Sequence, residues 1–287
     1  MSESLIETKR RITTIESTKK ITKAMKLVSS VKYQRLKKAY EDNKNYFLSM
    51  RHVMVKTVSC LNMSSFSHTE YLKHYDSNKT LYIVVSSTLG LCGSYNYSIF
   101  KLLDPILKEN DELIIIGNKG HIHYKNTNYK IYDEFISIFD NYDYDTVKTL
   151  RHFLFRKHRQ NEYKEIKLIY THYKNSMSFI PEMLTIAPLD IEDLKAEADL
   201  NSYPPIFEPN NVEVADLIFP HYVDSLLYHK LLESALSEQA SRRNAMESAT
   251  DNAEDLLDDL KITYNKSRQS LITQEITEVV AGSNASK

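Results

Sequence analysis

Apolar positions divide the chain into three stretches with different spacing. In residues 1–60 and 221–281 apolar side chains are sparse and follow each other mostly at steps of three or four, and neither stretch contains Gly or Pro. Because Gly and Pro interrupt helices, each stretch is expected to form one long helix. At about 1.5 Å per residue, such a helix would be on the order of 80–90 Å long.

A narrow apolar stripe is expected along each terminal helix. Narrow stripes are typical of coiled coils, and a long helix without a partner is only marginally stable in water. We therefore predict that the two ends of the chain pair with each other as an antiparallel coiled coil. The expected stripe residues are Ile12, Ile15, Ile21, Met25, Val28, Val31, Leu36 and Ala39 in the first helix, and Leu227, Leu231, Ala235, Ala245, Ala249, Ala253, Leu257 and Leu260 in the last.

The middle of the chain alternates short apolar runs with helical patterns. Such alternation is typical of an α/β domain with a mostly parallel sheet. The expected strands are 80–87, 111–117, 165–173 and 182–189, and a helical stretch follows the first of them as far as Leu107. The Pro- and Asn-rich segment 201–211 suits a linker. The expected division is a first helix over 1–60, an α/β domain with its linker over 61–210, and a last helix over 211–287.

Charge supports the pairing of the two ends. The net charge is −1, from 37 basic and 38 acidic residues, which argues against a nucleic-acid-binding protein. Residues 9–38 nevertheless hold eleven Lys or Arg and one acidic residue, Glu16, whereas 247–259 hold six acidic residues and no basic one. In an antiparallel pair these two segments face each other. Exposed ion pairs contribute about 0–1 kcal/mol each, so we expect them to select register more than to add stability.

Several classes of site are disfavoured. No apolar run is long enough to cross a bilayer, the first residues lack the apolar core of a secretory signal, and direct membrane insertion is not expected. The two cysteines, Cys60 and Cys92, are too few for a disulfide framework or a zinc site and are expected to be free thiols. The histidines of 121–123, with His152 and His158, lack ligand spacing, so neither a metal nor a cofactor is predicted.

Five segments together resemble the γ subunit of bacterial F-type ATP synthases. They are ITKAMKLVSSVKYQRLKKA (21–39), GLCGSYN (90–96), IFEP (206–209), SEQASRRNAMESATDNA (237–253) and YNKSRQSLITQEITEVVAGSNA (264–285). The resemblance implies a non-catalytic rotor, with a coiled coil inside the α3β3 hexamer and a Rossmann-like middle domain near the ε subunit and the ring of c subunits. It also implies a peripheral location on the cytoplasmic face of a bacterial membrane.

The same resemblance implies which residues contact the β subunit. In KSRQSLITQEITE (266–278) it places Arg268, Gln269 and Thr273 against a β-subunit loop, with Glu275 and Glu278 as weaker candidates. Arginine suits this role because its guanidinium forms paired, charge-assisted bonds to carboxylates. From spacing alone, a solvated helix face is the simpler interpretation.

A second set of candidates lies in the first helix and its partner. The resemblance puts Met25 near a β-subunit lever loop, where Lys23 and Lys26 could meet acidic residues, and it pairs Arg242 with Met25. The alternative interpretation of Met25 is that it lies in the seam of the coiled coil and has no special role. Arg243 and Asn244 depart from the apolar residues usual in the family.

The glycine-rich turn GLCGSYN invites comparison with a phosphate-binding loop. A turn of this kind between strand and helix can bind phosphate, but neither G-x-G-x-x-G nor G-x-x-x-x-G-K-[ST] occurs in the chain. We therefore predict a structural turn and no nucleotide site. Thr88 and Leu89 replace a charged pair that is usual in the family before this glycine.

Two further functions are compatible with the pattern. One is the rotor of an F1-like ATPase that serves another mechanical task without a proton-translocating ring, motivated by Thr88 and Leu89 in a divergent middle domain. The other is a free-standing coiled-coil or nucleotide-binding scaffold protein. Co-purification with α, β, ε and a c ring would distinguish the ATP synthase rotor from both.

Overall fold

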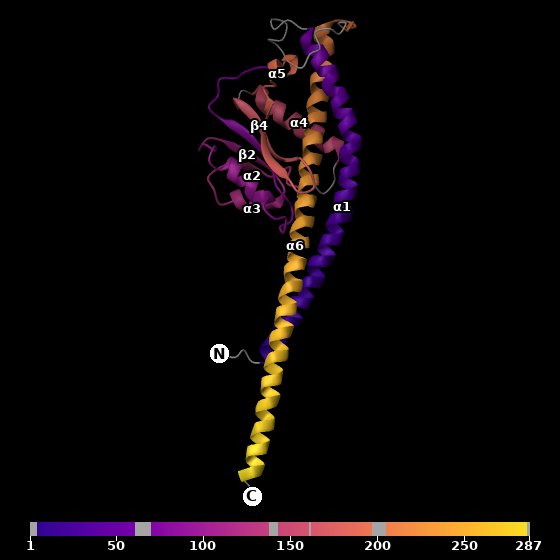
Figure 1. Ribbon diagram of the computed structural model, residues 1–287. Helices are drawn as coiled ribbons and strands as arrows, with labels where there is room; N and C mark the ends of the chain where they lie inside the picture. The colour runs from indigo at the N-terminus through magenta and orange to yellow at the C-terminus, as the bar shows by residue number, and fades with distance from the viewer. Residues whose placement is uncertain (1–4, 61–69, 138–142, 161, 197–204, 286–287) are drawn as a thin grey trace. The chain divides into compact units, whose positions relative to one another are not determined.

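The computed structural model describes residues 5–60, 70–137, 143–160, 162–196 and 205–285. Packing divides the chain into two units. The first, here called the coil unit, comprises residues 1–30 and 242–287, and the second, the sheet unit, comprises 31–241. Helices α1 (Leu5–Ser59) and α6 (Asn211–Ala285) each contribute residues to both units (Figure 1).

The two terminal helices match the predicted segments closely. Helix α1 has 55 residues and α6 has 75, which correspond to about 80 and 110 Å. Pro220 lies inside α6, near its start. As the tenth residue of α6, this proline lies beyond the first turn, and it removes one backbone hydrogen bond at a cost of about 3 kcal/mol that the packing of the rest of the helix offsets.

A five-stranded sheet forms the centre of the sheet unit. Its order is β3-β2-β1-β4-β5, with β1, β2, β3 and β4 parallel and β5 antiparallel to β4. This is the order of the first four strands of a doubly wound fold, extended by an antiparallel edge strand, so the α/β prediction is confirmed. The strands are β1 (Thr80–Val85), β2 (Glu112–Ile116), β3 (Lys130–Tyr132), β4 (Glu165–Tyr173) and β5 (Phe179–Ala187).

The structure corrects two boundaries and adds one strand. Strand β5 begins at Phe179 rather than at residue 182, because its first residues pair with the end of β4. The short edge strand β3 was not predicted, since three residues carry too little pattern. Helix α2 (Tyr95–Leu103) ends before Leu107, and Pro105, which follows closely, cannot donate to continue the ladder. The predicted linker lies partly outside the described residues, and residues 205–210 are not helical.

Both faces of the sheet are buried. Ile83, Ile114 and Leu168 face one core, where α4 (Tyr144–Arg159) and α6 pack, whereas Val84 and Ile115 face the other, under α2 and α3 (Asn118–Tyr124). The remaining short helix is α5 (Ile191–Ala196). Burying one such aliphatic side chain contributes about 1.5–3 kcal/mol, so these strands hold the unit together.

Candidate functional site

Two ion pairs join α1 and α6 in the coil unit. The Lys19 ammonium lies 2.8 Å from the Glu254 carboxylate, and the Lys26 ammonium lies 2.7 Å from that of Glu247. The hydrogen bond from each lysine lowers the pKa of its glutamate below the ordinary value. The lower residue numbers of α1 meet the higher ones of α6, so the predicted antiparallel pairing and its charge complementarity are confirmed.

The seam of α1 differs from the predicted apolar stripe. Its less exposed positions follow a heptad pattern from Leu5 to Ser29, with Met25 as an additional half-buried position, and several are polar, since Thr8, Thr22 and Ser29 are buried. The prediction was correct for α6 but wrong for Ile21, Val28 and Val31, which are 60%, 57% and 71% exposed. Ile21 and Val28 directly precede the seam residues Thr22 and Ser29, and one residue rotates a side chain by about 100° around a helix.

Small polar side chains explain how this seam holds. The Thr250 hydroxyl lies 2.9 Å from the Thr22 hydroxyl and 2.7 Å from the Met246 carbonyl of its own helix, so its one proton is shared between these two acceptors. Lys19 and Lys26 are half-buried, so their methylene stems cover the seam while their ammonium groups reach the acidic residues. A search for apolar residues alone could not find these positions.

Helix α6 extends beyond the start of α1. Moving fourteen residues along α1 from Lys19 to Leu5 advances α6 from Glu254 to Arg268, and the half-buried positions of α6 end at Ser267. In Figure 1 the last part of α6 continues as a single helix. Every residue with a described side chain from Arg268 onward is exposed.

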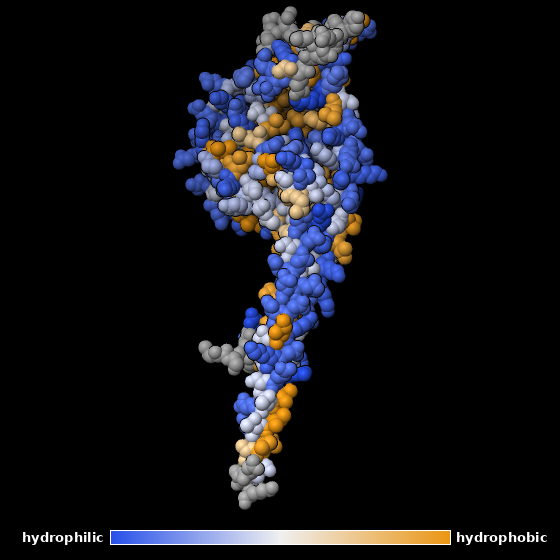
Figure 2. Space-filling view, in the orientation of Figure 1, coloured by the Kyte–Doolittle hydropathy of each residue, from blue (hydrophilic) through white to orange (hydrophobic). Residues whose placement is uncertain are grey.

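This single-helix segment carries an apolar stripe that sequence reasoning missed. Ile272, Ile276, Val279 and Val280 are between 45% and 72% exposed, and Figure 2 shows apolar surface near this end of α6. At about 100° per residue, Arg268, Gln269, Thr273 and Glu275 flank the stripe on the same side of the helix. In the sequence the signal is the spacing of these four apolar residues at steps of four, three and one, which places them on one side of the helix. We call these eight residues the tip face.

Hydrogen bonds within α6 orient side chains in and beside the tip face. The Thr273 hydroxyl donates to the Gln269 carbonyl over 2.9 Å, which fixes the side chain against its own helix. On the other side of α6, the Gln274 amide donates to Glu278 over 2.9 Å. Glu278, a weaker candidate, is therefore turned away from Gln269 and Thr273.

The second set of candidates lies where α1 and α6 pair. Lys23 is exposed, Met25 is half-buried and Lys26 is already bonded to Glu247. Arg242 is buried. The register places Met25 level with Glu247 and Ser248, so Arg242 lies about 9 Å further along the helix axis.

In the sheet unit, α6 fills the place where doubly wound folds bind ligands. Such folds bind at the carboxyl ends of the strands, where the strand order reverses, which here lies between β1 and β4. The Ser234 hydroxyl accepts from the Thr171 backbone N–H over 3.2 Å and bonds to the Tyr95 hydroxyl over 2.8 Å. Ser241 donates to the Cys92 carbonyl over 2.6 Å. The chain's own helix therefore closes this crevice.

The glycine-rich turn is bonded to its surroundings. The Asn96 amide donates to the Ser87 hydroxyl over 2.7 Å and its oxygen accepts from the Ser87 N–H over 3.0 Å. Gly93 has a φ of 57°, a conformation that favours glycine. These contacts agree with a structural turn. Position 117 also requires glycine, because a Cβ on Gly117 would overlap the carbonyl of Ser86.

The histidines have structural surroundings. His121 bonds to Asp133 and His123 to Asp104, while His158 is buried and bonds to the Lys73 carbonyl. Among the described residues, no group of three or more His, Cys, Asp or Glu is placed to hold a metal ion. Within the same residues, no helix is long and apolar enough to cross a membrane.

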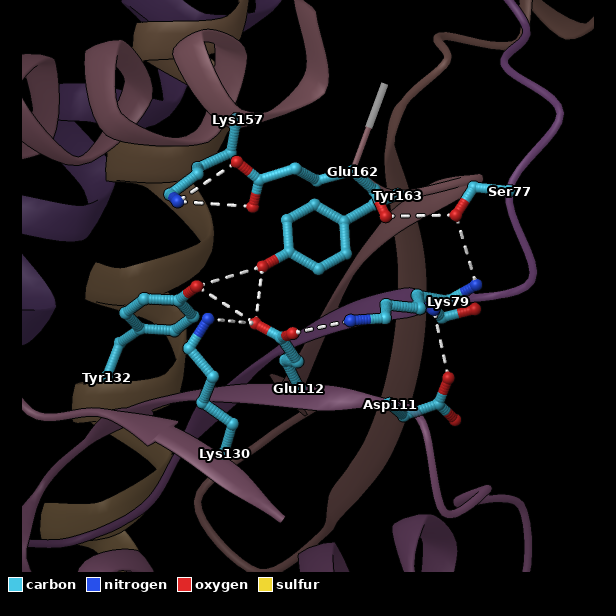
Figure 3. Close-up of polar contacts among 10 residues, drawn as sticks. Ser77, Lys79, Asp111, Glu112, Lys130, Tyr132, Lys157, Glu162 and Tyr163 are labelled. Atoms are coloured by element: carbon cyan, nitrogen blue, oxygen red, sulfur yellow. Dashed lines mark hydrogen bonds and ion pairs between the residues drawn. The ribbon is translucent and has the colours of Figure 1, made fainter. Parts of the chain in front are cut away.

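A buried carboxylate organises the amino-terminal ends of the strands. Glu112 accepts hydrogen bonds from Tyr163 over 2.7 Å and Tyr132 over 2.9 Å, and the ammonium groups of Lys79 and Lys130 each lie 3.1 Å away (Figure 3). Burial alone would raise the pKa of Glu112, but these four partners lower it to about 2. Four partners compensate the charge of this buried carboxylate, so the cluster is a structural anchor.

Comparisons with known proteins agree with this architecture. The family model described as ATP synthase matches residues 4–285. The ATP synthase gamma chain of Mycoplasma mycoides is 34% identical, covering 96% of this chain and 97% of the relative, and that of Lachnoclostridium phytofermentans is 38% identical, covering 98% and 99%. The central stalk of the Tetrahymena thermophila mitochondrial ATP synthase is similar with a TM-score of 0.58 and 26% identity, over 80% of this chain and 99% of that one.

Paired terminal helices joined to an α/β sheet therefore define a central-stalk subunit of a rotary ATPase. The chain belongs to the ATP synthase family, where its relatives are γ chains. The resemblance found in the sequence is thereby confirmed, and the function is that of a rotor within an ATP-synthesising complex.

Proposed function

We propose that this chain turns inside an α3β3 hexamer and grips the β subunits through the tip face of α6. The observation that carries the proposal is the combination of apolar and hydrogen-bonding side chains on one exposed side of an unpaired helix. A lone helix with such a stripe gains stability only by burying it against a partner. Arg268 and Gln269 lie at the base of this face, where they can bond to a loop that surrounds the helix.

The roles of the four tip-face candidates differ chemically. Arg268 offers a planar guanidinium that suits a carboxylate, with a contribution of roughly 1.5–3 kcal/mol for a hydrogen bond to a charged group. Gln269 and Thr273 can bond to backbone groups, and Glu275 can accept from a basic side chain. The apolar stripe supplies non-directional contact, which allows the bonds to exchange as the rotor turns.

The paired segment of the coil unit supplies a second contact. Lys23 is exposed and can meet an acidic lever loop of β, with Met25 beside it. Lys26 can contribute by exchanging Glu247 for an acidic residue of β, while buried Arg242 supports the helix pair from within. Figure 2 shows that the visible face of this segment is mostly polar, which suits a surface whose contacts break at each step.

We also propose that the chain has no catalytic activity by itself. The closed crevice between β1 and β4 and the bonded glycine-rich turn support this, since neither leaves an evident place for a nucleotide. ATP chemistry then belongs to the α and β partners. The sheet unit would meet ε and a c ring on the cytoplasmic face of a bacterial membrane, as a peripheral protein.

A matched pair of double variants tests the tip face. Arg268→Ala with Gln269→Ala should weaken assembly with α3β3 or lower torque, and it should leave the helicity of the isolated chain unchanged. Ser270→Ala with Gln274→Ala changes the opposite side of the same helix and should behave as the unaltered chain. Normal assembly and torque in the first variant would remove Arg268 and Gln269 from the proposed interface.

Mass spectrometry of the intact native complex tests the partners. The proposal expects α, β, ε and a c ring together with this chain. A complex with α and β but no c ring would favour the F1-like ATPase, for which Thr88 and the 64%-exposed Leu89 are the motivating departure. A free monomer would favour the scaffold alternative.

A further inference from the structure

Polar groups on α6 attach this helix directly to the sheet. Ser234, Ser237 and Ser241 follow at steps of three and four, so they share one side of the helix, and all three are buried. Ser234 accepts from the Thr171 N–H, and Ser241 donates to the Cys92 carbonyl. The Ser237 hydroxyl lies 3.3 Å from the Thr171 carbonyl and 2.9 Å from the Glu233 carbonyl of its own helix, so its one proton is shared between the strand and the helix. We call these three residues the serine row.

A buried carboxylate reinforces the serine row. The Glu233 side chain is 1% exposed, and its oxygens lie 2.6 Å from the His172 ring nitrogen and 3.0 Å from the Lys230 ammonium. It also accepts from the Tyr173 N–H over 3.3 Å. Thr171, His172 and Tyr173 are consecutive residues at the carboxyl end of β4, so one short stretch of strand is fixed to one turn of helix.

Helix α1 is attached differently. Figure 1 shows α6 lying between α1 and the sheet in this unit. Asn43 of α1 bonds to His229 of α6 over 3.0 Å, and Arg51 bonds to Tyr222 of α6 over 3.3 Å. At the rim of the sheet, the hydroxyls of Tyr33 and Tyr173 lie 2.6 Å apart. The serine row therefore belongs to the one of the two terminal helices that lies next to the sheet.

We propose that the serine row, supported by Glu233, is the joint that carries torque between the sheet and α6. The proposal rests on the rotor function proposed above. A load that twists a helix about its axis is resisted poorly by apolar contacts, which are non-directional, and strongly by hydrogen bonds, which have a preferred geometry. Because serine is small, the bonds join strand and turn backbone rather than mobile side chains. Ser234, Ser237 and Ser241 are thus positioning residues for torque transfer.

The chain offers a matched control for this joint. Ser225 is also fully buried on α6 and lies about 180° around the helix from Ser234, and its hydroxyl has no hydrogen-bond partner among the described residues. Ser225→Ala removes the same atom as Ser234→Ala without removing a bond to the sheet. Tyr33→Phe removes a hydroxyl contact between α1 and the sheet and serves as the comparison for the other helix.

The test is single-molecule rotation of the assembled α3β3 complex with a load on the sheet unit. A bead is attached through Met177→Cys, at an exposed position between β4 and β5, in a Cys60→Ser background. The Ser234→Ala, Ser237→Ala, Ser241→Ala variant should keep unloaded ATPase activity but lose about half or more of the torque delivered to the bead, because its directional bonds are absent. Ser225→Ala should deliver full torque, and Tyr33→Phe should lose less than the triple variant.

Three outcomes would overturn the joint. Full torque in the triple variant would show that packing alone transmits the load. A proportional fall of unloaded ATPase and torque would indicate a general structural role. An equal loss of torque in Ser225→Ala would mean that removing any buried hydroxyl from α6 has this effect, whether or not it bonds to the sheet.

If the triple variant does not assemble, two double variants replace it: Ser234→Ala with Ser237→Ala, and Ser237→Ala with Ser241→Ala. Full torque in both double variants rejects the joint. A lack of rotation in the unaltered complex would instead reject the proposed rotor function.

Discussion

The Lys26 ammonium lies 2.7 Å from the Glu247 carboxylate, although the two residues stand near opposite ends of the chain. Their side chains are 35% and 49% exposed, so water screens the pair. Lys26→Glu should destabilise the helix pair by no more than about 1 kcal/mol, and Lys26→Glu with Glu247→Lys should recover most of the loss. A double-mutant cycle in urea measures the coupling. A zero coupling energy at low salt would mean that this contact does not help to set the register.

His229 gives the sheet unit an acid-sensitive element. Its ring is stacked between Tyr40 and Phe47, with centroids 4.9 and 4.5 Å away, and burial lowers its pKa to about 4. The unfolded chain therefore takes up a proton at a higher pH than the folded one. The stability due to neutral His229 is complete above pH ~6.5 and decreases as the pH falls toward 4, by up to about 3 kcal/mol.

The His229→Phe variant isolates this effect. Phenylalanine keeps the stacking and cannot be protonated, so the variant should lose the part of the stability change between pH 6.5 and 4 that belongs to His229. Urea unfolding of the full chain at several pH values measures this change, with His52→Phe, at an exposed position of α1, as the control variant. An unchanged profile in His229→Phe would contradict the assignment.

The lowered pKa of Glu112 predicts a second loss of folding stability at lower pH. Its pKa is about 2 in the folded chain, below the ordinary value of 4.5. Its contribution is present above pH ~4.5 and is lost as the pH falls toward 2. Glu112→Ala should cost about 1–3 kcal/mol at pH 7, because the buried Tyr163 hydroxyl loses an acceptor. Glu109→Gln, at an exposed position nearby, is the control. Equal urea midpoints for the two variants would contradict the cluster's anchoring role.

The apolar stripe of the tip face should matter only in the complex. Ile272→Ser with Ile276→Ser changes two side chains that are exposed in the chain, so the midpoint of its urea unfolding should not fall. Binding to α3β3 should weaken, since each buried aliphatic side chain contributes about 1.5–3 kcal/mol. Calorimetry or pull-down with purified α and β measures the binding. Full affinity in this variant would show that the stripe remains exposed in the complex.

The long helices could be predicted because the absence of Gly and Pro and the segregation of charge are local signals. The seam of α1 could not, because its positions are filled by Thr8, Thr22 and Ser29 while Ile21 and Val28 point outward. That α6 closes the crevice between β1 and β4 could not be predicted either. Ser234 and Ser241 are unremarkable in sequence, and their role comes from meeting Thr171 and Cys92, which are far away along the chain.

The candidate site was predicted in part. The resemblance selected Arg268, Gln269 and Thr273, and the structure adds that they share one exposed side of α6 with Ile272 and Ile276. Their contact with β remains a prediction. The apolar stripe escaped attention because its meaning depends on where the partner helix begins, which is a fact of register rather than of composition.

A disulfide across the helix pair tests the central claim most directly. Thr22→Cys with Thr250→Cys, in a Cys60→Ser background, joins two positions whose hydroxyl oxygens lie 2.9 Å apart. In the assembled complex the bond should form readily under mild oxidation and leave ATP-driven rotation intact, because both residues belong to the same rotor. Failure of the bond to form, or a rotation that stops when it does, would contradict an antiparallel pair that turns as one body.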